Sequence, residues 1–309
     1  MSSLRSAVED YLRMRRALGY KLESPGRQLG QFVAYLEQTG AKTVTIENAV
    51  AWATLPAQAD PCYWSERLSV VRQFARHLQT IDPACEVPPA RLLPYRSKRA
   101  IPYPYTPEEI AALMRAAARL PSPLMAATYP TLFGLLAVSG LRVGEAIGLD
   151  RDDIDARHGL LRVINSKFGK SREVPLHASA MRALDAYSRR RDQLCPQPAS
   201  EAFFVSTAST RLQGPHIHRV FSQLKRTVGL EPRSPRCRPR LHDLRHRFAV
   251  NTLIDWYRQD VDVQARLPRL STYMGHAEPS DTYWYLTAAP ELLGLAARRL
   301  EPTIEQVSG

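Results

Sequence analysis

The sequence predicts a mainly α-helical fold with one small β-sheet. Apolar residues recur every three or four positions between residues 4 and 78, which is the spacing of a buried helix face. Two short apolar runs, near residues 154–164 and 173–176, enclose a glycine-containing turn and indicate a hairpin. A proline-rich stretch between these regions prevents a helix and indicates a connector. The expected helical domain, connector and second domain span residues 1–82, 83–105 and 106–309.

Composition and charge narrow the classes of function. The 309 residues are 44% apolar and 23% charged, which is ordinary for a globular protein, but the formal net charge is +12. A surplus of this size indicates a polyanionic partner, with nucleic acid as the first candidate and a solubilising surface as the alternative. The N-terminus is charged from the start and no apolar run reaches about 18 residues, so we expect a cytoplasmic protein without a membrane span.

The cysteines and histidines predict no metal or cofactor site. Cys62, Cys85, Cys195 and Cys237 lie far apart and form neither a CxxC pair nor a cysteine–histidine ligand pattern. We therefore expect reduced thiols. The sequence also has no glycine-rich nucleotide loop.

Four helices are expected in the N-terminal domain. The pattern of residues 4–38 is interrupted by the Ser-Pro-Gly run at 24–26, which predicts two helices, and Thr45 is a suitable N-cap for a third. The fourth, from about residue 64 to 78, carries three arginines that we expect to face outward: Arg67, Arg72 and Arg76. They could contact DNA phosphates or cover a solvated surface, and the net charge favours DNA.

Two further basic segments are candidate DNA contacts. Arg96, Lys98 and Arg99 lie within the proline-rich connector, which we expect to follow a nucleic-acid backbone. The second segment is an arginine-rich loop that ends directly before His242, and its expected DNA contacts are Arg236, Arg238 and Arg240.

The second domain begins with clear helix signals. Thr106 is placed as an N-cap with Pro107 at the first helical position. A later helix ends at Gly140, and the next helix carries Arg142 and Glu145 three positions apart. The remaining expected elements are the hairpin, with its turn at 167–170, and helices near 177–194, near 214–228 and from 242.

Reactive side chains gather in the last third of the chain. His242 and Arg245 are three apart, so a helix places both on one side. Gly275-His276 follows, and then a tyrosine-rich run at 283–285. Guanidinium groups bind phosphate oxygens and a phenol can attack phosphorus, so this segment suits chemistry on a phosphodiester.

This set of residues, in this order, resembles the tyrosine recombinase (phage integrase) family over roughly residues 100–300: Arg142, a hairpin lysine, His242, Arg245, His276 and Tyr285. The resemblance implies a SAM-like helical core-binding domain followed by an α+β catalytic domain. It also implies a site-specific recombinase that cuts and rejoins double-stranded DNA through a 3′-phosphotyrosyl intermediate, for integration, excision or transposition of a mobile element. The expected assembly is a homotetramer on two DNA sites.

The resemblance and the side-chain chemistry together assign a role to each residue. Arg142 and Arg245 are expected to clamp the phosphate, with Glu145 as an orienting partner. His242 is expected to act as general base. Lys167 is the expected general acid, with Lys170 on the same turn as the competing candidate and otherwise a DNA contact. His276 is expected to donate a hydrogen bond to the phosphate.

Tyr285 is the expected nucleophile. Tyr283 lies two positions earlier, so a helix turns the two phenols about 200° apart and only one can face the arginines. In the family, the nucleophile lies nine residues after the histidine that corresponds to His276, which selects Tyr285. A helix over residues 290–300 is expected to dock on a neighbouring protomer, with packing on its own domain as the alternative.

Two features depart from the family pattern, and two other functions stay open. The segment between Arg245 and His276 is longer than usual, and Met274 replaces a usual leucine. One alternative is strand transfer like that of a type IB topoisomerase or a telomere resolvase. The other is a DNA-binding protein that is catalytically idle.

Overall fold

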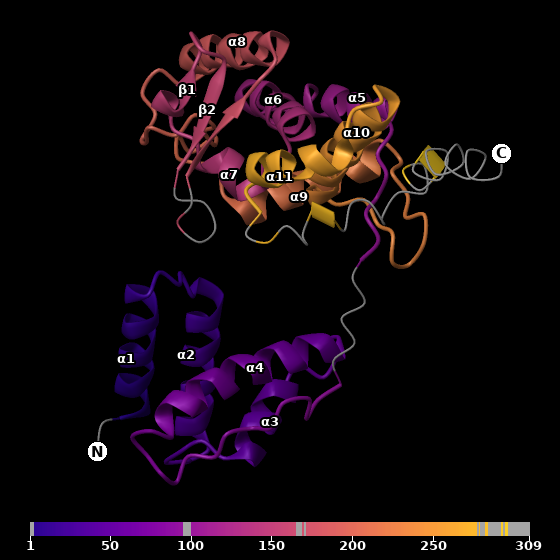
Figure 1. The fold of residues 1–309 in the computed structure, drawn as a ribbon. Helices are drawn as coiled ribbons and strands as arrows, with labels where there is room; N and C mark the ends of the chain where they lie inside the picture. The colour runs from indigo at the N-terminus through magenta and orange to yellow at the C-terminus, as the bar shows by residue number, and fades with distance from the viewer. Residues whose placement is uncertain are drawn as a thin grey trace, which may run out of the picture. The chain divides into compact units, whose positions relative to one another are not determined.

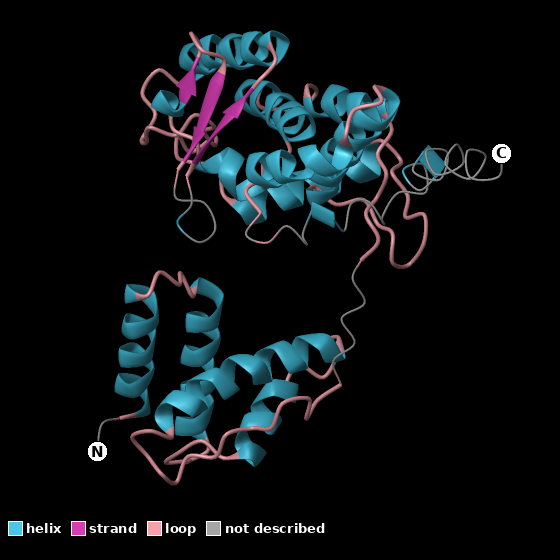
Figure 2. Ribbon diagram, in the orientation of Figure 1, coloured by secondary structure: helices cyan, strands magenta, loops and turns pink. Residues whose placement is uncertain are grey.

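The computed structural model of the protein describes residues 3–94, 100–164, 169, 171–276, 278, 282–283, 292 and 294–295. The chain divides into two compact units, Met1–Arg99 and Ala100–Gly309. Figure 1 shows helices in both units and a small sheet in the second, and the helices, cyan in Figure 2, make up most of the ribbon. The predicted fold class, mainly α-helical with a small sheet, is confirmed.

The described part of the first unit contains four helices: α1 (Leu4–Ala17), α2 (Glu23–Gln38), α3 (Ile46–Thr54) and α4 (Pro61–Leu78). Their apolar stripes meet in one core, where Phe32 of α2, Trp52 of α3 and Phe74 of α4 are almost fully buried. Thr45 caps α3 as predicted, because its hydroxyl accepts from the backbone N–H of Asn48.

The break between α1 and α2 lies earlier than predicted. It falls before Glu23, where Leu22 adopts a positive φ of 46°, whereas residues 24–26 lie inside the first turn of α2. Proline is tolerated in the first turn of a helix because the N–H it lacks would have no partner there. The prediction that the Ser-Pro-Gly run separates two helices is therefore wrong.

Arg67 is buried, which corrects the prediction that it faces outward. Its residue exposure is 6%, its guanidinium lies 3.7 Å from the centroid of the Trp52 ring, and its Nη2 donates to the Trp52 carbonyl at 2.7 Å. Position 67 shares a helical stripe with Val71, Phe74 and Leu78, at steps of four, three and four residues. Arginine fits this stripe because it can stack on an aromatic ring and bind a carbonyl together.

The other two arginines of α4 differ from Arg67. Arg72 is half-buried and donates to the carbonyls of Pro88 and Pro89, at 2.8 and 2.9 Å. Arg76 is exposed.

The N-terminal end of the expected connector packs onto the first unit, and its C-terminal end packs onto the second. Cys85 is buried in the core of the first unit, next to Glu86, whose backbone N–H donates to the Val44 carbonyl at 2.8 Å. Tyr103 and Tyr105 are buried in the core of the second unit. Arg96, Lys98 and Arg99 lie outside the described residues.

The second unit is built around α6 (Pro123–Ser139), which packs against α5, α8 and α10. Around it, the structure describes α5 (Pro107–Ala117), α7 (Val143–Gly148), α8 (Ala178–Leu194), α9 (Gly214–Thr227), α10 (His242–Arg258) and α11 (Val263–Met274). Thr106 caps α5 in a full capping box with Glu109, as predicted. Although α6 is apolar on most sides, no helix in the described ranges has both the length and the hydropathy to cross a bilayer.

The sheet is a three-stranded antiparallel meander, β1 (Ile154–Asp155), β2 (Leu160–Val163) and β3 (Arg172–Pro175). In the β2–β3 register, Leu161 pairs with Val174 and Arg162 pairs with Glu173. Leu161 and Val174 are buried while Arg162 is exposed, so one face of the hairpin joins the core. Lys167 and Lys170, in the turn between β2 and β3, lie outside the described residues.

Candidate active site

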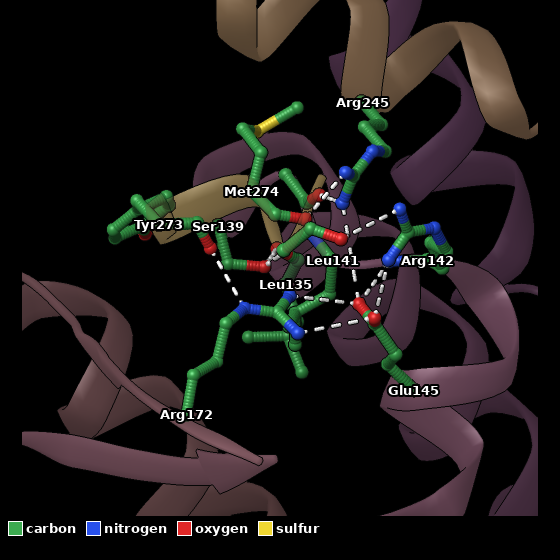
Figure 3. Close-up of polar contacts among 11 residues, drawn as sticks. Leu135, Ser139, Leu141, Arg142, Glu145, Arg172, Arg245, Tyr273 and Met274 are labelled. Carbon is green, nitrogen blue, oxygen red and sulfur yellow. Dashed lines mark hydrogen bonds and ion pairs between the residues drawn. The ribbon is translucent and has the colours of Figure 1, made fainter. Parts of the chain in front are cut away.

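The C-terminal end of α11 is held by three arginines from three other elements. Arg142 is the N-cap residue of α7, Arg172 begins β3, and Arg245 lies in the first turn of α10. Figure 3 shows their guanidinium groups converging on this helix end.

Three consecutive backbone carbonyls at this helix end each accept one arginine. The pairs are Arg172 Nε with Tyr273 O at 2.8 Å, Arg245 Nη2 with Met274 O at 2.5 Å, and Arg142 Nη2 with Gly275 O at 3.0 Å. The last carbonyls of a helix have no partner within the helix and carry its partial negative charge. Positive side chains therefore satisfy them well, and the turn before His276 is fixed as a result.

A buried carboxylate, that of Glu145, lies between these arginines (Figure 3). Its side chain is 5% exposed, and it accepts from Arg142 Nη1 at 2.8 Å and from both Nη atoms of Arg172 at 3.1 and 2.9 Å. Arg245 Nη1 is 4.0 Å away. Burial alone would raise the pKa of Glu145, but hydrogen bonds from Arg172 and from the Arg142 backbone outweigh it, so the pKa is lowered and the group stays ionised.

Two glycines allow the close approaches at this site. Gly275 ends α11 with a φ of +65°, and a Cβ atom there would lie 2.7 Å from Arg172 Nη1. Gly140 ends α6 with a φ of +61°, and a Cβ atom there would lie 2.5 Å from Phe248 Cδ1. The Gly140 carbonyl accepts from Arg245 Nη1 at 2.5 Å. Both positions thus need glycine for backbone conformation and for space.

Exposure separates the two arginines that were predicted to clamp a phosphate. The side chain of Arg142 is 26% exposed, whereas that of Arg245 is 2% exposed with both Nη atoms donating to backbone carbonyls. Arg142 is therefore the one that a ligand can reach directly, whereas Arg245 is buried.

His242 begins α10, one turn before Arg245, and is exposed. The pKa of His242 is lowered mainly because the surrounding protein partly desolvates the ring, and the charge of Arg245 lowers it further. The charge of Asp243 acts in the opposite direction. Its ring meets that of His246 edge-on, with 4.8 Å between centroids. At neutral pH this imidazole is uncharged and can accept a proton.

His276 follows Gly275 directly and is half-buried. Its Nδ1 lies 2.7 Å from the hydroxyl oxygen of Thr282, which is itself 1% exposed. This contact fixes the orientation of the ring.

Comparison with known proteins identifies the family. Residues 105–291 match the phage integrase family. The Sinorhizobium fredii protein y4rB, described as an integrase/recombinase, is 47% identical over 307 residues, which cover 97% of this chain and 98% of the relative. The chain belongs to the phage integrase family. It is a tyrosine-type site-specific recombinase.

More distant tyrosine recombinases are also similar to this chain, in sequence or in fold. The tyrosine recombinase XerC of Azotobacter vinelandii is 28% identical over 285 residues, covering 90% of this chain and 89% of that protein. Among solved structures, the XerH recombinase bound to its difH substrate after cleavage has the same fold, with a TM-score of 0.64 at 16% identity. That match covers 97% of this chain and 86% of XerH.

The structure of this integrase brings together most of the predicted catalytic residues that it describes. Arg142 and Arg245 share one cluster with Glu145, the predicted orienting partner, and His276 follows the turn that the cluster holds. Lys167 and Tyr285 lie outside the described residues, as does the predicted helix over 290–300 apart from a few positions.

The predicted DNA contacts before α10 separate into two kinds. Arg236 and Arg238 are exposed. Arg240 is half-buried and forms a two-nitrogen contact with the carboxylate of Asp243, at 2.7 and 3.1 Å. Asp243 is fully buried, so Arg240 neutralises it and fixes the start of α10.

Sequence reasoning missed Arg172. The signal was present, because Arg172 and Val174 are two apart on β3 and therefore face the same, buried side of the hairpin. A charged residue in that position indicates a buried partner, which is Glu145. Within the described ranges, no group of three or more His, Cys, Asp or Glu side chains could hold a metal ion.

Proposed function

We propose that this recombinase breaks DNA strands by attack of Tyr285 on a phosphate bound at the arginine cluster. The observation that carries the proposal is the convergence of Arg142, Arg172 and Arg245 around Glu145 and the turn before His276. In-line attack on a phosphodiester concentrates negative charge on the non-bridging oxygens, and prearranged cations stabilise that charge.

Within the cluster, the two predicted clamp residues act differently. Arg142 is accessible and contacts the phosphate oxygens directly. Arg245 is buried, so it contributes its positive charge from behind and holds the Met274 carbonyl in place. His276 lies at the end of the same turn and donates a hydrogen bond to the phosphate.

Proton transfer completes the reaction. A phenol has a reference pKa of about 10, so Tyr285 needs a proton acceptor and nearby cations to attack near neutral pH. The lowered pKa of His242 keeps its imidazole neutral, as a general base must be. Lys167 protonates the departing 5′-oxygen, and the resulting 3′-phosphotyrosyl ester retains the bond energy for rejoining.

Exposed basic residues extend the DNA contact beyond the site. Arg76 on α4 and Arg236 and Arg238 before α10 are exposed. We infer that they contact DNA phosphates together with Arg96, Lys98, Arg99 and Lys170. The partner is double-stranded DNA, bound by a homotetramer that joins two sites.

The biological role is movement of DNA. The similarity to integrase/recombinase y4rB supports integration, excision or transposition of a mobile element. The protein acts in the cytoplasm, where its four free cysteines stay reduced.

A nicked suicide substrate tests the nucleophile, because it traps the covalent protein–DNA complex after cleavage. Tyr285→Phe removes the attacking oxygen and should abolish the trapped complex while DNA affinity stays within about twofold of wild type. Tyr283→Phe is the matched control, since Tyr283 is 46% exposed and lies two positions away, and it should still trap. Trapping by Tyr285→Phe but not by Tyr283→Phe would assign the reaction to the other phenol.

A further inference from the structure

Arg172 makes more contacts at the site than its position in a strand requires. All three nitrogens of its guanidinium donate: Nε to the Tyr273 carbonyl at 2.8 Å, Nη1 to Glu145 Oε1 at 3.1 Å and Nη2 to Glu145 Oε2 at 2.9 Å. The side chain is 11% exposed. It therefore joins β3, α7 and α11, which are far apart in the sequence, at a single planar group.

Glu145 depends on Arg172 because its carboxylate has two oxygens to satisfy. One oxygen accepts Arg142 Nη1 at 2.8 Å, and the other accepts the Arg142 backbone N–H at 2.9 Å. Arg172 supplies one further donor to each oxygen, in the fork geometry that only a guanidinium offers. With these positions filled, Arg142 contacts Glu145 through Nη1 and keeps Nη2 directed at the Gly275 carbonyl.

We propose that Arg172 is a positioning residue of this recombinase, which fixes Glu145 and, through Glu145, the guanidinium of Arg142 at the phosphate. The inference rests on the proposed function of Arg142. Without the Arg172 fork, one acceptor position on each Glu145 oxygen is left open, and the guanidinium of Arg142 can turn inward to fill both. A phosphate would then meet a clamp that points away from it.

Arg172→Lys is the variant that tests this role. Lysine keeps a positive charge beside buried Glu145, so the fold is retained, but its single ammonium cannot bridge two carboxylate oxygens and a carbonyl. Arg162→Lys is the matched control, because Arg162 lies on the adjacent strand, is exposed and is outside the cluster. Displacement of a reacting group by about 1 Å costs about 10²-fold, so Arg172→Lys should slow trapping on the suicide substrate by about that factor. Arg162→Lys should match wild type.

A second substrate separates positioning from general destabilisation. A methylphosphonate at the scissile position carries no negative charge, so an arginine clamp stabilises its cleavage less than that of a phosphodiester. Arg142→Ala should therefore slow the phosphodiester more than the methylphosphonate, and Arg172→Lys should shift this ratio in the same direction. In the Arg142→Ala background, adding Arg172→Lys should slow trapping by no more than about a further twofold. The reason is that Arg172 acts through Arg142, which is already removed.

Each result bears on one hypothesis. An Arg172→Lys variant that slows both substrates equally, or that multiplies its full defect with that of Arg142→Ala, overturns the positioning role. The positioning role is also overturned if Arg172→Lys lowers the melting temperature but keeps the wild-type ratio of phosphodiester to methylphosphonate cleavage rates. In that case Arg172 would only stabilise the fold. Failure of the wild-type protein to form any covalent complex would instead contradict the proposed function.

Discussion

The Nη2 atom of Arg142 donates to the carbonyl oxygen of Gly275 at 3.0 Å, although 133 positions separate the two residues. This bond links the start of α7 to the turn before His276. Arg142→Ala removes it together with the accessible guanidinium, so trapping on a suicide substrate should slow by about 10²–10³-fold. DNA affinity should change little, because most protein–DNA contacts are made to phosphates and sugars other than the scissile phosphate.

The control for Arg142→Ala is Arg182→Ala, which removes an exposed arginine of α8. It should leave both trapping and affinity unchanged. A fall in affinity as large as the fall in rate would show that Arg142 binds DNA without a special role in cleavage.

Gly275→Ala should disturb the site through two effects. A non-glycine residue at a φ of +65° is strained by about 1–2 kcal/mol, and the added Cβ lies 2.7 Å from Arg172 Nη1. Gly229→Ala isolates the first effect, since Gly229 has a φ of +69° and nothing within 4 Å of its Cβ position. Both variants should melt earlier than wild type, but only Gly275→Ala should slow trapping. Equal trapping rates would disprove a close steric fit at Gly275.

The pH dependence of cleavage should report His242. Partial desolvation by the surrounding protein and the charge of Arg245 lower the pKa of this imidazole below its ordinary value of 6.5, so it loses its basic form only at more acidic pH. At DNA concentrations well below saturation, where the rate reports the free protein, the acid limb of trapping should therefore have its midpoint below pH 6.5, and His242→Gln should remove that limb along with most of the activity. A midpoint above 6.5 would exclude His242 as the base.

The same shift predicts a change in stability. Below pH 6.5 the unfolded chain binds a proton at His242 that the native protein does not bind until the lower, native pKa is reached. The free energy of unfolding should therefore fall as the pH drops through this window, and His242→Gln should weaken that fall. Chemical denaturation at a series of pH values measures both.

Substitution of two arginines of α4 should affect stability in one case and not in the other. Arg67 is buried against Trp52 and donates to its carbonyl, so Arg67→Ala should cost about 1.5–3 kcal/mol of stability, as expected for a hydrogen bond from a charged group. Arg76 is exposed, so Arg76→Ala should leave stability unchanged.

Salt titration of DNA affinity distinguishes the same pair. Each phosphate contact adds about −0.9 to the slope of log affinity against log salt, and Arg76→Ala should reduce the slope by about that amount. Arg67→Ala should keep the wild-type slope. A reduced slope for Arg67→Ala and an unchanged one for Arg76→Ala would reverse the assignment of the two residues.

The sequence predicted the elements that have strong local signals. Thr45 and Thr106 cap their helices as expected, because capping depends on neighbours within one turn. The order of elements around Gly140, Arg142 and the hairpin is confirmed for the same reason. The break at 24–26 was misplaced, since a proline in the first turn of a helix gives the same local signal as one between helices.

What the sequence did not predict depends on contacts between distant segments. Arg67 looks like a surface residue until Trp52, fifteen positions earlier, supplies a ring and a carbonyl for it. The contact of Arg172 with Tyr273 spans 101 positions, so it could only be seen once β3 and α11 were placed together. Residue type alone also did not distinguish the accessible Arg142 from the buried Arg245.

Three arginines bind the carbonyls of Tyr273, Met274 and Gly275, and these contacts affect how the kinetics of arginine variants are interpreted. The end of α11 cannot fray without breaking these bonds, so formation of the site and closure of the last helical turn are one cooperative event. A substitution at Arg142 or Arg245 loosens that turn, and with it His276, in addition to removing a cation. The loss of rate therefore measures a sum, and the phosphate contact of either arginine accounts for only part of it.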